Sequence, residues 1–384
     1  MFAFLSFLLI AANLRPAITT VGPLISSIQD ATGLSGTALG LLSSLPLLAF
    51  AAFAPLANFG RRFGLERVLT VAMVMLFTGL LIRSSGSAIA LYCGTLLLAA
   101  GIAIGNVLVP SIIKRDYPDR INTLTTIYAL VLTLTAAIAS GLAVPLERLL
   151  PGGWQSALAV WAIPAALAAA LWAWASFRPR HTPPPNPNST TSSVWRSPIA
   201  WCVTTFMGLQ SLCFYVSIAW LPKVIQDNGH DPAFAGLMIT GLQLVSLVSG
   251  AAMPRLLAKR KNQSGLALFA ALTMATGFFG LLAYPKAAMI WVCVVGFGSG
   301  ISFPLAIALI GLRTRDHHQA TSLSLMSQSI GYLLAASGPL LFGLAHDISG
   351  GWLIPLGGLT ACAVVQAGMG YLGGRDRMVS DATE

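Results

Sequence analysis

The side chain best placed to do chemistry in this sequence is an arginine inside an apolar run. Arg15 would lie about 20 Å along a helix that begins at Met1, at 1.5 Å per residue. A charge at that depth of a membrane costs roughly 2.5–3.5 kcal/mol unless it faces water or a partner. We place all twelve carboxylates and all five histidines in loops or in the tail, so we expect no acidic partner. The pattern therefore predicts that Arg15 binds the negative charge or acceptor oxygens of a small solute.

Two other roles for Arg15 stay open. Pro16 removes one helical N–H bond and leaves the Ala12 carbonyl free to accept from the guanidinium, which would be a structural role. Alternatively, Arg15 faces a water-filled cavity without touching a ligand.

Polar and aromatic side chains at similar depth in other apolar runs are candidates to line the same site. For each of them the alternative role is a bond between helices, worth about 0.6 kcal/mol on average. Gln210, Phe214 and Ser217 stand at i, i+4 and i+7, so they share one face of a helix, and an amide beside an aromatic ring suits a small, flat, polar ligand. The candidates for substrate binding, besides Arg15, are Asn13, Thr19, Asn106, Tyr128, Gln210, Phe214, Tyr215, Gln243, Gln328 and Tyr332.

These residues belong to a chain whose composition excludes a water-soluble fold. Of 384 residues, 56% are hydrophobic and 9% are charged, whereas a soluble domain has roughly 25% charged residues. The surplus of ten positive charges is split into short clusters between apolar runs, which excludes the continuous basic stripe of a nucleic-acid binder. The five cysteines show no CxxC spacing and His317 and His318 are adjacent, so we expect no disulfide framework, no metal site and no cofactor.

The elements that must position the candidates are twelve membrane-spanning helices. A helix needs about 20 apolar residues to cross the hydrocarbon layer, and dividing the chain at charges and turn signals yields twelve such runs. The predicted spans are 3–28, 36–57, 68–84, 88–112, 122–146, 155–177, 198–222, 234–257, 265–283, 288–312, 320–343 and 353–373.

The distribution of basic residues predicts the orientation of these helices. Seventeen Lys and Arg residues fall in one set of loops and the tail, and four, including Arg83, fall in the opposite set. Basic loops stay in the cytoplasm, so we expect both termini to be cytoplasmic.

The two halves of the chain repeat each other. Arg115-Asp116 recurs as Arg315-Asp316, and Gly152-Gly153-Trp154 recurs as Gly350-Gly351-Trp352, at an offset of about 200 residues. A segment rich in Pro, Ser and Thr separates the halves. We therefore predict an all-α membrane protein with two pseudo-symmetric six-helix bundles, 1–177 and 198–384, and a cytoplasmic linker, 178–197. Parallel halves of this kind are the plan of the major facilitator superfamily, and the repeat offset predicts that Gln210 and Arg15 share one membrane depth.

Several segments resemble one family of bacterial major facilitators, the cyanate permeases and nitroimidazole transporters. They are NLRPAITTVGPL from Asn13, LLSSLPLLAFAAFAPLA from Leu41, GIAIGNVLVPSIIKRDYP from Gly101, GLQSLCFYVSIAWLP from Gly208 and GFGSGISFPLAIALIGLRTRDHHQA from Gly296. The resemblance implies transport of a small solute by alternating access. One departure is that Arg61 stands where the superfamily's signature has an aspartate, and Glu66 is the candidate to take over its charge role.

The sequence thus predicts a facilitative or secondary active transporter, a uniporter or antiporter, for a small polar or anionic solute such as cyanate. The alternative is an efflux transporter for a neutral aromatic compound such as a nitroimidazole drug. An enzyme would need a general base or metal ligand in the membrane, and the spans offer only Arg15, tyrosines and amides. We expect the partners to be the substrate and membrane lipid, with no nucleic acid, and the chain to be a monomer.

Overall fold

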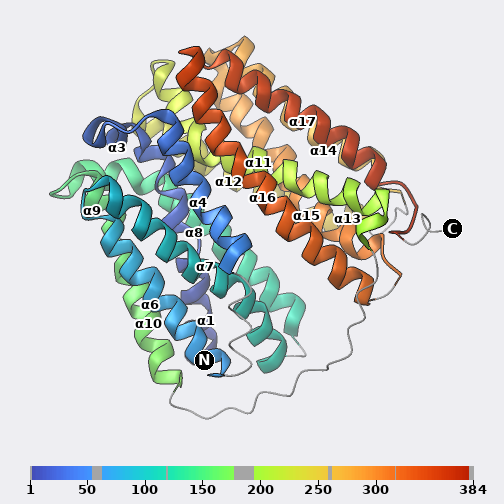
Figure 1. Cartoon of the computed structure of the whole chain (residues 1–384), viewed down its shortest axis with the longest axis horizontal. Coiled ribbons are helices and arrows are strands. Elements are labelled where there is room, and N and C mark those ends of the chain that lie inside the picture. The colour runs from blue at the N-terminus through green and yellow to red at the C-terminus, as the bar shows by residue number, and fades with distance from the viewer. Residues whose placement is uncertain are drawn as a thin grey trace. The chain divides into compact units, whose positions relative to one another are not determined.

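The computed structural model describes residues 2–53, 63–117, 120–176, 194–257, 262–315 and 317–379, and every regular element in them is a helix (Figure 1). The helices before the linker are α1 (Phe2–Asn13), α2 (Pro16–Thr19), η1 (Gly22–Leu24), α3 (Ile25–Thr32), α4 (Gly36–Phe53), α6 (Leu65–Arg83), α7 (Ala88–Asp116), α8 (Ile121–Leu149), α9 (Trp154–Ala159) and α10 (Ala162–Ser176). Those after it are η4 (Val194–Arg196), α11 (Pro198–Asp227), α12 (Pro232–Ala251), α13 (Met253–Leu257), α14 (Ser264–Ala283), η5 (Pro285–Ala287), α15 (Ala288–Leu312), α16 (His317–Ser349) and α17 (Leu353–Gly373).

Twelve stretches of the described chain are long and apolar enough to cross a membrane, as predicted. They are Phe7–Thr32, Gly36–Phe53, Leu65–Arg83, Ala88–Val109, Ile127–Leu149, Trp154–Trp174, Pro198–Asp227, Pro232–Ala251, Ser264–Ala283, Pro285–Leu312, Ser322–Ser349 and Leu353–Gly373.

The placement of every carboxylate and histidine in loops was wrong. The helices continue past the apolar runs, because backbone hydrogen bonding does not stop where hydropathy falls. Their first or last turns therefore carry Asp30, Glu66, Asp116, Glu147, Asp227, His317, His318, His346 and Asp347.

The chain divides into two compact units, one comprising Met1–Leu34 and Leu41–Asn186 and the other Ser35–Gly40 and Pro187–Glu384. The start of α4 therefore groups with the second unit. The predicted boundaries of the two bundles stay a prediction, and most of the predicted linker, together with Arg61, lies outside the described residues.

Glycines let helices of each unit approach until backbones touch. In the first unit α6 packs against α7 and α10. A Cβ at Gly101 of α7 would collide with the Ala72 carbonyl of α6, and one at Gly94 would collide with the backbone of Arg83. In the second unit, Gly296 of α15 meets the Leu242 backbone of α12 in the same way. The close approach agrees with the packing role of small residues between membrane helices.

A partly buried ion pair joins the start of α6 to the end of α7. Arg115 Nη2 lies 2.6 Å from Glu66 Oε1, and Arg115 also binds Asp116 through Nε at 2.6 Å. Partial burial would lower the pKa of Arg115, but the hydrogen bonds and negative charges of Asp116 and Glu66 outweigh burial and raise it. Glu66 thus has a charged partner, as the predicted charge role requires.

A buried arginine also joins two helices of the second unit, and its Nη1 lies 3.6 Å from Asp376 Oδ1. Arg313, which follows α15, donates to Gln263 Oε1 at the start of α14, and the two pairs have sequence separations of 49 and 50 residues. Arg313 also donates to the carbonyls of Gly373, at 3.1 Å, and Gly374, at 2.9 Å. These bonds satisfy carbonyls at the end of α17 that have no helical donor.

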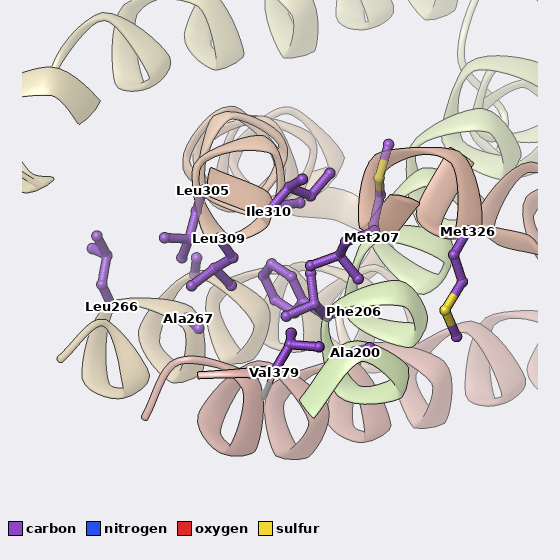
Figure 2. Packing of buried hydrophobic residues seen from close by; sticks show 14 of the residues in the cluster. Ala200, Phe206, Met207, Leu266, Ala267, Leu305, Leu309, Ile310, Met326 and Val379 are labelled. Atoms are coloured by element: carbon purple, nitrogen blue, oxygen red, sulfur yellow. The ribbon is translucent and has the colours of Figure 1, made fainter. Parts of the chain in front are cut away.

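The residues after α17 fold back onto the second unit. Val379 N donates to the Arg313 carbonyl at 2.9 Å, and the Val379 side chain joins the main apolar cluster of this unit. Figure 2 shows Val379 beside Phe206 and Ala200 of α11. The same cluster contains Leu305 and Leu309 of α15, so the C-terminal segment helps to hold α11 and α15 together.

Asp347, near the end of α16, caps the start of α4 within the second unit. Its carboxylate accepts from Gly36 N at 2.9 Å, from Thr37 N at 2.6 Å and from Thr37 Oγ1 at 2.7 Å. Gly343 makes the contact possible, because a Cβ there would collide with the Gly36 carbonyl. The first N–H groups of a helix have no acceptor within the helix, and the Asp347 carboxylate supplies one to α4.

We expect Asp347→Ala to destabilise the protein by about 1–2 kcal/mol, because it removes three hydrogen bonds from one helix start. The measurement is the melting temperature of purified protein in detergent. Asp231→Ala is the matched control, since Asp231 caps α12 by accepting from Ala233 N, at 2.8 Å. Equal losses for the two variants would contradict the cap at α4.

Candidate functional site

The first membrane span is not one continuous helix, contrary to the prediction for 3–28. It consists of α1, the single turn α2, η1 and α3, with breaks at residues 14–15 and 20–21. Pro16 has no N–H to donate to the Ala12 carbonyl, which weakens the helix at this point. Arg15 precedes α2, and its carbonyl accepts from Ile18 N at 3.0 Å and Thr19 N at 3.1 Å. The strongest candidate residue thus lies at a helix interruption.

Neighbouring helices of the first unit bind the polar groups of the interrupted segment. Asn13 Nδ2 donates to the Pro164 carbonyl of α10 at 3.1 Å, and Thr19 Oγ1 donates to the Ala136 carbonyl of α8, also at 3.1 Å. In return, Ser140 Oγ of α8 donates to the Thr19 carbonyl at 3.2 Å. Asn13 and Thr19 were both predicted to contact the ligand, but these side-chain donors bind the carbonyls of neighbouring helices.

Arg83, a residue that the sequence analysis did not propose for the site, also binds the interrupted segment. Arg83 Nη1, at the end of α6, donates to the Ala17 carbonyl at 2.5 Å, and the side chain is 1% exposed. Arg83 was expected in an outer loop, so the expectation that Arg15 is the single intramembrane charge is wrong. The available signal was that Arg83 directly follows an unbroken apolar run.

Two other candidates of the first unit gather near Arg15. Tyr128 Oη of α8 and Asn106 Oδ1 of α7 are 3.1 Å apart, and Tyr128 is buried. The half-buried Arg15 is close enough to Tyr128 for an electrostatic interaction between its charge and the hydroxyl group. The Phe7 ring of α1 lies 5.9 Å from the Tyr128 ring, centroid to centroid. The first unit thus brings together the Arg15 cation, the Asn106 amide and the Tyr128 phenol, with the Phe7 ring beside the phenol ring.

The candidates of the second unit centre on α11. Gln210 is 2% exposed; its Nε2 donates to Ser211 Oγ at 2.8 Å, and its Oε1 has no hydrogen-bond partner among the described residues. Phe214 and Tyr215 make an edge-to-face contact with ring centroids 5.4 Å apart. A buried acceptor without a donor is costly, so Gln210 Oε1 is a position where a ligand N–H or a water would be stabilised.

The remaining predicted residues have bonds within their own helices. Gln243 of α12 is buried and donates weakly to the Ile239 carbonyl, at 3.5 Å. Gln328 of α16 is exposed and donates to Ser324 Oγ at 2.9 Å. A second buried amide that was not predicted is Gln366 of α17, which contacts Ser302 of α15 at 3.3 Å.

Comparison with known proteins places the chain among membrane transporters. The model of the Major Facilitator Superfamily matches residues 3–339. The chain is 44% identical to an uncharacterised transporter of Bacillus subtilis (96% of this chain, 92% of the relative) and 42% identical to the 2-nitroimidazole transporter of Escherichia coli (97% and 95%). It is 28% identical to the cyanate transport protein of Escherichia coli, over 94% of both chains.

The fold agrees with solved transporters. The crystal structure of a D-xylose–proton symporter superposes with a TM-score of 0.77 at 16% identity, covering 96% of this chain and 97% of that one. The prediction of a transporter rather than an enzyme is confirmed by the family match. Since the matches extend over nearly the whole chain, this protein belongs to the major facilitator superfamily, in the family of the cyanate and nitroimidazole transporters.

Proposed function

We propose that this chain transports a small, planar, polar or anionic solute, of the size of cyanate, across a bacterial inner membrane. Its two six-helix bundles would alternate between conformations open to one side of the membrane and to the other, as in other transporters built from parallel repeats. The basic loops favour cytoplasmic termini. We further propose that the chain works as a monomer with membrane lipid around it.

The observation that carries the proposal is Arg15 at an interrupted span. Irregular backbone at membrane depth is tolerated where it is buried in protein or lines a cavity. Arg15 is half-buried there, and its guanidinium offers donors in the planar arrangement that fits two oxygens of one anionic or nitro group. The Tyr128–Asn106 pair, 3.1 Å apart, adds a neutral hydrogen-bonding group within range of that charge.

Efflux of a neutral aromatic compound is the second candidate. Two observations favour it: the 42% identity to a protein named as a 2-nitroimidazole transporter, and the aromatic pairs Phe7–Tyr128 and Phe214–Tyr215. A nitro group presents two oxygens to a guanidinium without a net charge, and a flat ring packs on aromatic side chains. Both candidates use Arg15, so they differ in the solute rather than in the residue.

We expect Arg15→Lys to weaken the apparent affinity for the transported solute about tenfold, because it keeps the charge and loses the planar fork. Arg15→Ala should weaken it about 10- to 100-fold, which corresponds to a charge-assisted bond of ~1.5–3 kcal/mol. The measurement is uptake by proteoliposomes with cyanate and 2-nitroimidazole as probes.

Arg148→Ala is the control for Arg15→Ala, since Arg148 is exposed near the end of α8 in the same unit. It should transport with unchanged affinity. An Arg15→Ala protein that transports both probes with the affinity of the unaltered chain would disprove the proposal.

We expect Gln210→Ala to weaken the apparent affinity up to about tenfold, since one neutral hydrogen bond contributes ~0.5–1.5 kcal/mol. The matched control is Gln366→Ala, because Gln366 is as deeply buried but was never a candidate for the site. Its substitution should lower the melting temperature and leave affinity alone. If both variants lose stability and neither loses affinity, Gln210 is a structural residue.

We expect transport to proceed by facilitated diffusion, exchange or symport of a proton carried by the solute itself. A proton relay through the middle of the spans has no obvious carriers among the described residues, because the carboxylates and histidines that the structure adds to helices stand in first or last turns. They are Asp30, Glu66, Asp116, Glu147, Asp227, His317, His318, His346 and Asp347. With nitrate, which stays deprotonated at neutral pH, proteoliposomes containing a pH-sensitive dye should show no proton flux coupled to solute movement. Coupled flux would contradict this expectation and direct attention to Glu147→Gln.

A further inference from the structure

Arg83 is a buried cation with few bonds for its charge. It ends α6, is 1% exposed, and donates through Nη1 to the Ala17 carbonyl at 2.5 Å. Its Nε and Nη2 have no hydrogen-bond partner, and its charge has no carboxylate partner, among the residues that the structure describes. Burying a charge without a counter-ion costs several kcal/mol, so a residue retained there needs a role that repays this loss of hydration.

The carbonyl that Arg83 binds is one that the interrupted span leaves without a helical donor. In a continuous helix Ala17 O would accept from Val21 N, but Val21 N donates to Ile18 O instead, at 3.4 Å. Arg83 replaces the missing backbone donor. A charged donor makes a shorter and stronger bond to a carbonyl than a neutral one, which suits a group buried away from water.

The backbone of Arg83 is itself fixed by α7. Gly94 of α7 lies so close that a Cβ there would collide with Arg83 N and approach Arg83 Cα to 2.7 Å. Gly79, one turn earlier in α6, meets the Leu98 backbone of α7 in a similar contact. Arg83 therefore reaches the interrupted span from a rigid pair of helices.

We propose that Arg83 is a positioning residue for Arg15. Ala17 is two residues from Arg15 in the single turn α2, whose other bonds come from neutral groups of α8, and Asn13 ties the chain before the break to α10. Arg83 is the charged member of this set of tethers. By holding the Ala17 carbonyl it fixes the rotation of α2, and with it the direction in which the Arg15 guanidinium points. The inference rests on the proposed role of Arg15 in substrate binding.

A double-mutant cycle tests the inference, with binding of cyanate and of 2-nitroimidazole measured on folded protein isolated by size exclusion. Arg83→Gln should weaken binding of the better probe about tenfold, the size of one lost hydrogen bond to the ligand. Arg83→Lys, which keeps one cationic donor for Ala17 O, should lose about two- to threefold. In the Arg15→Ala background, Arg83→Gln should change the remaining affinity by less than about twofold.

Arg313→Gln is the matched control, because Arg313 is equally buried and also binds carbonyls, those of Gly373 and Gly374 in the second unit. It should lower the melting temperature without changing affinity. If Arg83→Gln does not yield folded protein, the cycle is run with Arg83→Lys, whose loss should vanish in the Arg15→Ala background.

The outcomes separate this inference from the proposed function. An Arg83 variant with unchanged affinity, or one with the same loss of affinity whether or not Arg15 is present, overturns the positioning role while Arg15 remains a ligand. An Arg15→Ala protein with unaltered affinity for both probes overturns the proposed function, and the positioning role with it.

Discussion

The first unit depends on one physical constraint: backbone carbonyls inside an apolar bundle must be bound by protein, because lipid offers no donor. Pro16 interrupts the first span and leaves carbonyls without helical partners. Three neighbouring helices form hydrogen bonds with the interrupted segment. Arg83 of α6 and Ser140 of α8 donate to its carbonyls, and the Pro164 carbonyl of α10 accepts from Asn13. The same break that places Arg15 in the span therefore also determines which helices must pack around it.

The second unit meets the same constraint at its helix ends. Arg313, which follows α15, donates to Gln263 Oε1 and lies 3.6 Å from the Asp376 carboxylate. It also donates to the carbonyls of Gly373 and Gly374, which end α17. The C-terminal segment also packs on this bundle, since Val379 N donates to the Arg313 carbonyl. One buried arginine thus links the ends of α14, α15 and α17 to the C-terminal segment.

Hydropathy could predict the number of membrane spans and could single out Arg15 as a candidate. Both depend on how long the apolar runs are and on which residues interrupt them. It left open whether Asn13 and Thr19 bind a ligand or other helices, since that depends on which way each side chain points once the span is broken. Arg83 was misplaced for a related reason: a charge at the end of an apolar run reads as a loop residue, although here α6 includes it and α7 covers it. The close pairing of Gly79 and Gly94 explains this burial, and it appears only when the two helices are seen together.

The proposed role of Arg15 would account for a family with relatives named for solutes as different as cyanate and 2-nitroimidazole. A guanidinium binds oxygen acceptors whether they belong to an anion or to a neutral nitro group, and the Phe7 and Tyr128 rings would offer an apolar surface to either. The two kinds of solute would differ in their effect on the charge of Arg15. An anion would neutralise Arg15 inside the apolar bundle, whereas a neutral solute would leave a cation there, at a higher cost in hydration. Selectivity should therefore depend less on Arg15 itself than on how much polar surface the neighbouring helices present around it, and in the first unit Tyr128 and Asn106 are the described side chains that supply it.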